Sequence, residues 1–243
     1  MCVPRPSRLP RSREFAGSSA SSFWALCTVA RSGSTWFSQL VASTGQMGQP
    51  REHLLLWPEK ARQLGLGEIA LDAYLWHLMR TQSTGNGVFA IKGDRDHLAA
   101  FFEYFPAAPC VRLSRRDRVA QAVSWHRAHD GHVWTKRHDK APPPTSSRAA
   151  SVDRVLFFYD EIGRREQAWD QFFATRSEPP LSLVYEDVCH DPLVAVRAVA
   201  RHIGIDPLAI DRVESPLRVV RDASTAELTA QARRVIAARK RAE

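Results

Sequence analysis

The sequence predicts an α/β fold with a three-layer arrangement, in which a central parallel sheet carries helices on both faces. Short apolar runs bounded by turn residues are typical of buried parallel strands. Helical patterns lie between these runs, and such alternation favours a parallel sheet wrapped by helices. The predicted strands cover residues 23–29, 88–92, 110–113 and 181–185.

The predicted helices follow from apolar residues that recur at helical spacing and from stop signals such as Gly45. They cover residues 34–44, 67–83, 95–105, 117–128, 153–176, 192–203 and 225–241. Ligands of such folds bind at the carboxyl ends of the strands. Arg31, Lys92 and the Arg115/Arg116 pair all fall at predicted strand ends, so we expect the binding site there.

Length and composition favour one substantial domain, because the chain has 243 residues of which 44% are hydrophobic. We expect this domain to span residues 22–243 and residues 1–21 to form a disordered basic tail. The net charge of +8 calls for an anionic partner, either an anionic nucleotide or a nucleic acid. Much of the excess lies in Arg-rich ends, which are usually solvated.

Residues 129–151 interrupt the alternation, because they are polar and rich in proline. We expect a long loop or lid there. His129, His132, His138 and Asp139 resemble a metal cluster in composition only, since neither a thiolate nor a helical His-x-x-x-His spacing accompanies them. The sequence therefore predicts no metal site.

The segment from Phe23 to Trp36 reads as a buried strand, a tight turn and a helix start. Gly33 tolerates backbone angles that other residues resist, and the first N–H groups of a helix attract anions. Arg31 adds a fixed positive charge and a planar donor fork. The turn therefore suits a phosphate or a sulfate, although a plain Ser-capped helix start is the alternative. It is neither a Walker A loop nor a dinucleotide fingerprint.

This loop resembles the 5′-phosphosulfate loop of sulfotransferases, which use 3′-phosphoadenosine 5′-phosphosulfate (PAPS) as donor. The segment from Leu113 to Trp125 is similar to the 3′-phosphate segment of that superfamily, and its run R-R-D-R-V-A-Q-A-V-S resembles bacterial sulfotransferases of the trehalose 2-sulfotransferase type. Further similar segments are Gly45–Glu52, Gly87–Lys92, Tyr185–Asp187 and Asp191–Pro192. The resemblance runs from about Phe23 to about Ile205.

The resemblance implies a P-loop-like fold and a PAPS-dependent sulfotransferase that releases 3′-phosphoadenosine 5′-phosphate (PAP) and needs no metal. Sulfuryl transfer requires cations and N–H donors at the leaving 5′-phosphate and an anchor for the 3′-phosphate. Arg118 is a candidate accessory phosphate ligand, and Arg221 lies in a loop that often closes over the nucleotide in this superfamily. The implied donor-binding residues are Arg31, Ser32, Gly33, Ser34, Thr35, Arg116, Arg118, Ser124 and Arg221.

A base must also take the proton of the acceptor hydroxyl. Glu52 matches the presumed general base in the Pro-x-Glu motif of the resembled family. His53 is the rival base, although adjacent side chains on an extended segment point in opposite directions. Lys92 is a further candidate catalytic residue, placed to reach the transferred group or the acceptor, with a surface position at a strand end as the alternative. Trp57 is a candidate for stacking on a sugar, with core packing as its default role.

The resemblance favours a carbohydrate or glycolipid acceptor, such as trehalose or a related glycan. A kinase-like nucleotide enzyme and a non-enzymatic nucleic-acid-binding protein are the alternatives, but neither a Walker A lysine nor a nucleic-acid recognition motif occurs. No apolar run approaches the length of a membrane span, so only peripheral membrane contact stays open. The scattered cysteines suit a cytoplasmic protein, and a homodimer is left open.

Overall fold

A four-stranded parallel sheet forms the centre of the computed structural model, which describes residues 22–130, 151–217 and 223–242. The strands lie in the order β2-β1-β3-β4, so the first strand is internal. Their bounds are Ser22–Thr28 for β1, Val88–Gly93 for β2, Cys110–Ser114 for β3 and Leu181–Val184 for β4. All four predicted strands are confirmed.

Both faces of the sheet are buried, and successive side chains of a strand point to opposite faces, so one strand can contribute to two apolar cores. In β1, Trp24 and Leu26 belong to one apolar core, whereas Ala25 and Cys27 belong to the other. All four are fully buried. This double burial explains why β1 is a continuous apolar run rather than an alternating one.

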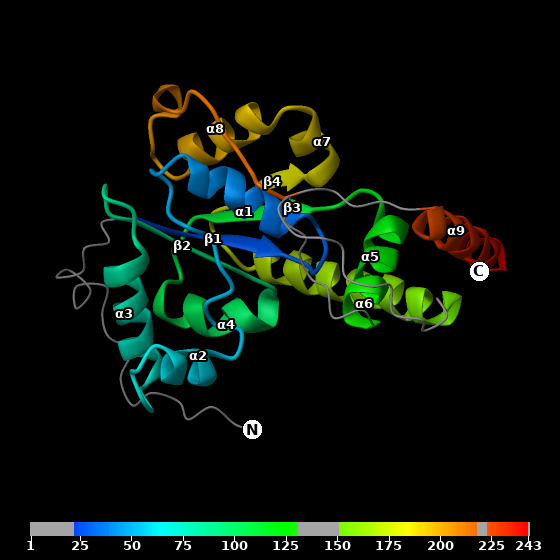
Figure 1. Ribbon diagram of the computed structural model, residues 1–243, viewed down its shortest axis with the longest axis horizontal. Coiled ribbons are helices and arrows are strands. Elements are labelled where there is room, and N and C mark those ends of the chain that lie inside the picture. Colours follow the sequence, from blue (N-terminus) through cyan, green and yellow to red (C-terminus); the bar gives the residue numbers. More distant parts are fainter. Residues whose placement is uncertain (1–21, 131–150, 218–222, 243) are drawn as a thin grey trace.

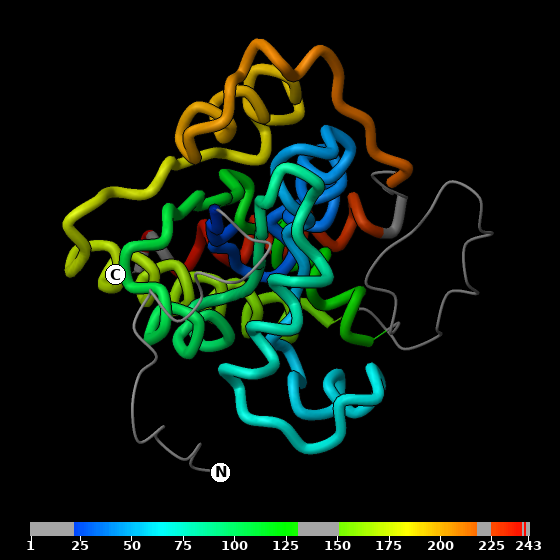
Figure 2. Tube along the Cα trace, turned by 90° about the vertical axis from the view of Figure 1, so that its left-hand side faces the viewer, coloured from blue at the N-terminus to red at the C-terminus, as the bar shows by residue number. Residues whose placement is uncertain are grey.

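Helices form the two outer layers (Figure 1). One layer holds α1 (Ser34–Ser43), α7 (Tyr185–His190) and α8 (Pro192–His202). The other holds α3 (Leu71–Gln82), α4 (Arg95–Tyr104), α5 (Arg118–Asp130) and α6 (Val152–Ala174). Figure 2 shows the α7–α8 part and the α2–α3 part at opposite ends of the molecule, with the sheet between them. The predicted three-layer α/β architecture is therefore confirmed.

The strand order places a topological switch point between β1 and β3. The chain leaves β1 toward β2 on one side, then crosses back to β3 on the other side. Ligands of open α/β sheets bind outside the carboxyl ends of the strands at such a point. The loops that begin near Arg31 and Arg115 meet at this place.

Several details differ from the sequence prediction. The structure adds the short helices α2 (Trp57–Gln63) and α7, and the 3₁₀ turn η1 (Pro207–Ala209). The helix expected to end at residue 128 continues to Asp130, where the His126 Nδ1 atom lies 3.2 Å from the Asp130 carboxylate. The last helix, α9 (Ala223–Ala242), contacts α5 and α6. The predicted tail (1–21) and most of the predicted lid (131–150) lie outside the described residues.

Among the residues that the structure describes, no helix has both the length and the apolar character needed to cross a bilayer.

Candidate active site at the carboxyl ends of β1 and β3

The loop after β1 is a tight turn with two residues in the left-handed backbone region. Arg31 has φ 63° and Gly33 has φ 87°. The Ser32 N–H donates to the Val29 carbonyl oxygen at 3.2 Å, which closes the turn. A Cβ atom at position 33 would overlap the ring of Tyr185. Glycine is therefore required at this position by both backbone angle and space.

The start of α1 is open to an anion. Gly33 is its N-cap, no side chain caps the helix, and its first turn holds no acidic residue. The Ser32 hydroxyl is fully buried and has no hydrogen-bond partner within the described part of the chain. Unfilled N–H groups and an orphaned hydroxyl fit a phosphate or sulfate oxygen.

Helix α5 holds this loop from the side. Ser124 and Gln121 lie three residues apart, on one face of the helix. The Arg31 Nε atom donates to the Ser124 hydroxyl at 3.0 Å, and the Gln121 amide donates to the Ala30 carbonyl oxygen at 2.8 Å. Burial lowers the pKa of Arg31, and the nearby Arg115 charge lowers that pKa further. Two cations held close together in this way would be relieved by a bound anion.

Lys92 connects the loop to the predicted base. Its ammonium donates to the Thr35 hydroxyl at 3.2 Å and lies 3.4 Å from the Glu52 carboxylate. The side chain is 5% exposed. Burial lowers the pKa of Lys92, and the neighbouring Glu52 carboxylate opposes part of that effect. The sequence offered Lys92 as a candidate catalytic residue, with an exposed strand end as the alternative; in the structure its side chain is buried and contacts both Thr35 and Glu52.

The backbone beside Glu52 is attached to the sheet. Arg51 forms an isolated parallel bridge with Ile91, and the Lys92 N–H donates to the Arg51 carbonyl oxygen at 2.9 Å. The Lys60 ammonium donates to the Glu52 carbonyl oxygen. The Glu52 side chain itself is 46% exposed, so its carboxylate stays accessible beside Lys92.

The two consecutive arginines after β3 take different directions. The Arg115 guanidinium donates to the Arg31 carbonyl oxygen at 3.3 Å and lies over the Tyr185 ring. Its buried Nε atom has no hydrogen-bond partner among the described residues. Arg116, the predicted 3′-phosphate ligand, is 63% exposed and bonds both Asp187 carboxylate oxygens at 2.9 Å. Arg115 is thus the arginine that contacts the Arg31 loop. The sequence placed it at a strand end but gave it no role in binding the donor.

The remaining candidates make other contacts or lie outside the described residues. His53 is buried, stacks on Phe89, and its pKa falls to about 4 because of burial and the nearby Lys60 and Arg51 charges. Trp57 packs against Tyr74 at a ring distance of 5.9 Å.

The Arg118 guanidinium lies over the Tyr159 ring, 5.3 Å from its centroid, on the side of α6. Arg221 lies outside the described residues. The accessory roles predicted for these two residues therefore stay predictions. In the same described ranges, no group of three His, Cys, Asp or Glu residues is arranged to hold a metal ion.

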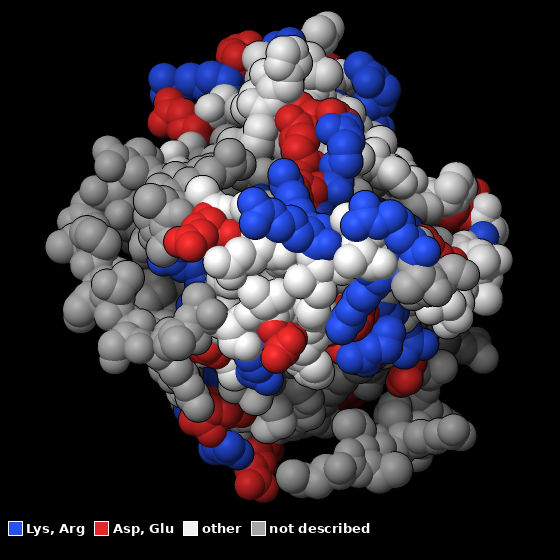
Figure 3. All heavy atoms as spheres, turned by 90° about the vertical axis from the view of Figure 1, so that its right-hand side faces the viewer, with Lys and Arg blue, Asp and Glu red and all other residues white. Residues whose placement is uncertain are grey.

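The surface around the site is basic. β1 ends toward the right of Figure 1, and Figure 3, which faces that side, shows Lys and Arg side chains gathered across the centre with Asp and Glu beside them. Fold and geometry together define the class: an α/β protein with a basic loop at the switch point of its sheet, where an open helix start can bind an anion.

Comparison with known families gives the particular assignment. The family model described as Stf0 sulphotransferase matches residues 90–234, which is more than half of the chain. The chain belongs to this family and is a PAPS-dependent sulfotransferase. The matched range contains Lys92, Arg116 and Ser124, whereas the Arg31 loop precedes it.

A solved structure supports the fold. A sulfotransferase from Alicyclobacillus acidocaldarius superposes with a TM-score of 0.54 at 14% identity, covering 90% of this chain and 94% of that one. Lower TM-scores belong to two further structures. The sulfotransferase domain of the Synechococcus PCC 7002 olefin synthase gives 0.47 at 14% identity, covering 87% and 94%. Mouse sulfotransferase SULT7A1 complexed with PAP gives 0.45 at 14% identity, covering 91% and 70%. No curated protein matches the chain.

Proposed function

We propose that this sulfotransferase modifies a hydroxyl group of a carbohydrate or glycolipid, such as trehalose or a related glycan, and that the cluster at the ends of β1, β2 and β3 performs the transfer. The observation that carries the proposal is the position of Lys92. Its ammonium contacts Thr35 in the donor loop and Glu52 at the same time. A cation in that position can stabilise the negative charge that develops on the leaving group and also contact the acceptor hydroxyl.

On the donor side, Arg31, Ser34, Thr35 and the open start of α1 bind the 5′-phosphosulfate. Negative charge grows on the 5′-phosphate oxygen as its bond to sulfur breaks, and buried cations stabilise that charge more strongly than exposed ones. Arg31 is fixed by Ser124 at 3.0 Å and needs little reorganisation. This is the preorganisation that group transfer requires.

The 3′-phosphate is bound by Ser124 and by the arginines that follow β3. Ser124 accepts from Arg31 and can still donate its own hydroxyl proton. Arg115 has an unsatisfied buried N–H group, which suits a phosphate oxygen. We keep Arg116 as a second ligand, and its bond to Asp187 then has to open when the donor binds.

On the acceptor side, Glu52 takes the hydroxyl proton. The acceptor oxygen forms a bond to sulfur, the bond between sulfur and the 5′-phosphate oxygen breaks, and the proton passes to the Glu52 carboxylate. The products are a sulfate ester and PAP. His53 fits this role less well, because its ring is buried and stacks on Phe89.

Support for a carbohydrate acceptor comes from the segments that resemble trehalose 2-sulfotransferases, which include Glu52 itself. A nucleic acid is not among the proposed partners, and membrane contact and a homodimer stay open. A cytoplasmic location is also part of the proposal, supported by the free thiols of Cys27 and Cys110.

The function is tested by offering sulfate-labelled PAPS with trehalose, other glycans, glycolipids, simple phenols and tyrosine peptides. We expect label on a carbohydrate hydroxyl and release of PAP. Label on phenols or peptides alone would contradict the proposed acceptor. Protection against heat by PAP, with ATP and DNA as controls, tests the donor site separately.

The donor side is tested by a matched pair of variants, Arg115→Ala and Arg116→Ala. Loss of a hydrogen bond to a charged group costs about 1.5–3 kcal/mol, so calorimetric titration with PAP should show weaker binding in both. The buried Arg115 should cause the larger loss. If Arg116→Ala alone weakens PAP binding, Arg115 is a structural residue and the assignment to it is wrong.

A further inference from the structure

The start of α5 already holds an anion, which is a side chain of the protein itself. One Glu186 carboxylate oxygen accepts the Arg116 N–H at 3.0 Å, and the other accepts the Asp117 N–H at 3.2 Å. These N–H groups precede the first residue of α5, Arg118. Such groups at a helix start have no partner within the helix and attract negative charge.

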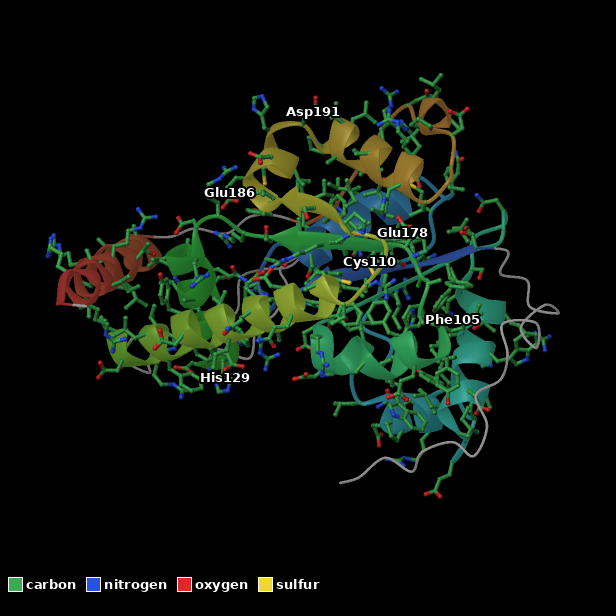
Figure 4. The ribbon with its side chains drawn as sticks, turned by 180° about the vertical axis from the view of Figure 1, so that it is seen from behind. Phe105, Cys110, His129, Glu178, Glu186 and Asp191 are labelled. Atoms are coloured by element: carbon green, nitrogen blue, oxygen red, sulfur yellow. The ribbon has the colours of Figure 1, made fainter. Side chains whose placement is uncertain are left out.

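Sheet pairing brings the two segments together. β3 and β4 run in parallel, with Ser114 opposite Val184, so the residues that follow each strand leave the sheet side by side. Figure 4 labels Glu186 beside the carboxyl end of β4. The contact between the α7 start and the α5 start therefore follows directly from strand register.

Electrostatics keep Glu186 ionised. Burial alone would raise the pKa of Glu186, but the backbone N–H groups of Arg116 and Asp117 and the Arg115 charge hold that pKa below its usual value. The Arg115 Nε atom lies 3.9 Å from the carboxylate, too far for a hydrogen bond. Glu186 thus binds the backbone and leaves the Arg115 fork available.

The position of the Glu186 carboxylate has two consequences for the binding of a donor phosphate. The Arg116 and Asp117 N–H groups are occupied, so the start of α5 cannot serve as the phosphate site in this arrangement. The bond also fixes the chain direction immediately after Arg115, whose guanidinium extends over Tyr185 to the Arg31 carbonyl oxygen. Without these two bonds the backbone after Arg115 would be held less firmly, and the Arg115 guanidinium would be directed less precisely.

We propose that Glu186 is a positioning residue of the donor site, which turns Arg115 toward the Arg31 loop by binding the backbone at the start of α5. This rests on the proposed role of that loop in binding the donor. Glu186 itself touches neither the donor nor the acceptor in this scheme.

The test uses calorimetric titration of PAP into wild type, Glu186→Ala, Glu186→Gln and the control Asp187→Asn. Glu186→Ala should weaken PAP binding at least about tenfold, because a misdirected Arg115 loses its hydrogen bond to the phosphate, and a bond to a charged group contributes at least that much. Glu186→Gln keeps an accepting oxygen and should recover part of the affinity. Asp187→Asn should bind at least as well as wild type, because it only weakens the exposed pair with Arg116.

Two results would overturn the role. If Glu186→Ala binds PAP as tightly as wild type or more tightly, the Glu186 carboxylate either has no effect on donor binding or competes with the donor. Equal losses in the Ala and Gln variants, together with a lower unfolding temperature in both, would mark general loss of structure.

Hydrogen exchange separates this proposal from the donor assignment. If the wild-type protein does not bind PAP, the proposed donor site is wrong. The rate of amide hydrogen exchange at residues 115–121 then still tests whether Glu186 positions this backbone. Faster exchange there in Glu186→Ala, with no change in β1 and β2, supports the positioning role. Unchanged exchange rejects it.

Discussion

Replacing Gly33 by alanine tests the loop geometry most directly. Gly33 has φ 87°, and an added Cβ would overlap the Tyr185 ring. The left-handed angle costs a non-glycine residue about 1–2 kcal/mol. Moving a packed ring costs about 1–3 kcal/mol more. We therefore expect Gly33→Ala to lower the free energy of unfolding by about 2–5 kcal/mol, the sum of these two costs.

Gly45→Ala is the matched control. Gly45 also has a left-handed φ, 67°, but a Cβ there would meet nothing within 4 Å. Only the backbone cost of about 1–2 kcal/mol applies. Denaturant unfolding with linear extrapolation measures both variants.

The two variants should also differ in donor binding. Because the Tyr185 ring supports the Arg115 guanidinium, Gly33→Ala should weaken PAP binding, whereas Gly45→Ala should leave it unchanged. Equal stability losses in both variants, with wild-type PAP affinity, would refute the contact between Gly33 and Tyr185.

The remaining predictions concern the base, the buried histidine and metals. In an initial-rate assay, Glu52→Gln should lower turnover by a factor of about 10²–10⁴, while its affinity for PAP barely changes. His53→Asn should keep most of the activity in that assay. The opposite pattern would make His53 the base. The folded-state pKa of His53 is about 4, against an ordinary value of 6.5, so the unfolded chain binds a proton first as the pH falls. Wild type should therefore lose about 3 kcal/mol of stability between pH 6.5 and 4, and His53→Asn should lack this part of the pH dependence; identical pH curves would refute the burial of a neutral ring. Activity should survive EDTA, and a strict metal requirement would move the mechanism toward phosphoryl transfer.

The fold was predictable because its strands are buried on both faces. Continuous apolar runs such as β1 stand out from the amphipathic helices around them, and their alternation determines the sheet type. The short helix α2 was missed, because seven residues beginning Trp57-Pro58 carry too little periodicity to identify a helix.

The candidate site was predictable only in part. The loop from Arg31 to Thr35 and the Lys92 strand end follow from motif and topology. The sequence could not show that Arg115 turns to the Arg31 loop and Arg116 to Asp187, because consecutive residues after a strand point in different directions and a one-residue shift exchanges them. The contacts of Gln121 and Glu186 with the backbone could not be predicted either, since they depend on which strands are neighbours.

The bridge between Arg51 and Ile91 has a consequence for how acceptor preference can change. It makes the segment just before the proposed base Glu52 a rudimentary extra strand beside β2, while the Arg31 loop follows β1 on the other side of β2. Neighbouring strands are about 4.8 Å apart, a spacing set by backbone hydrogen bonds that side-chain substitutions hardly alter. The distance between the proposed base Glu52 and the Arg31 loop is thus set by the backbone, and we expect substitutions beyond Glu52 to change acceptor preference without altering that distance.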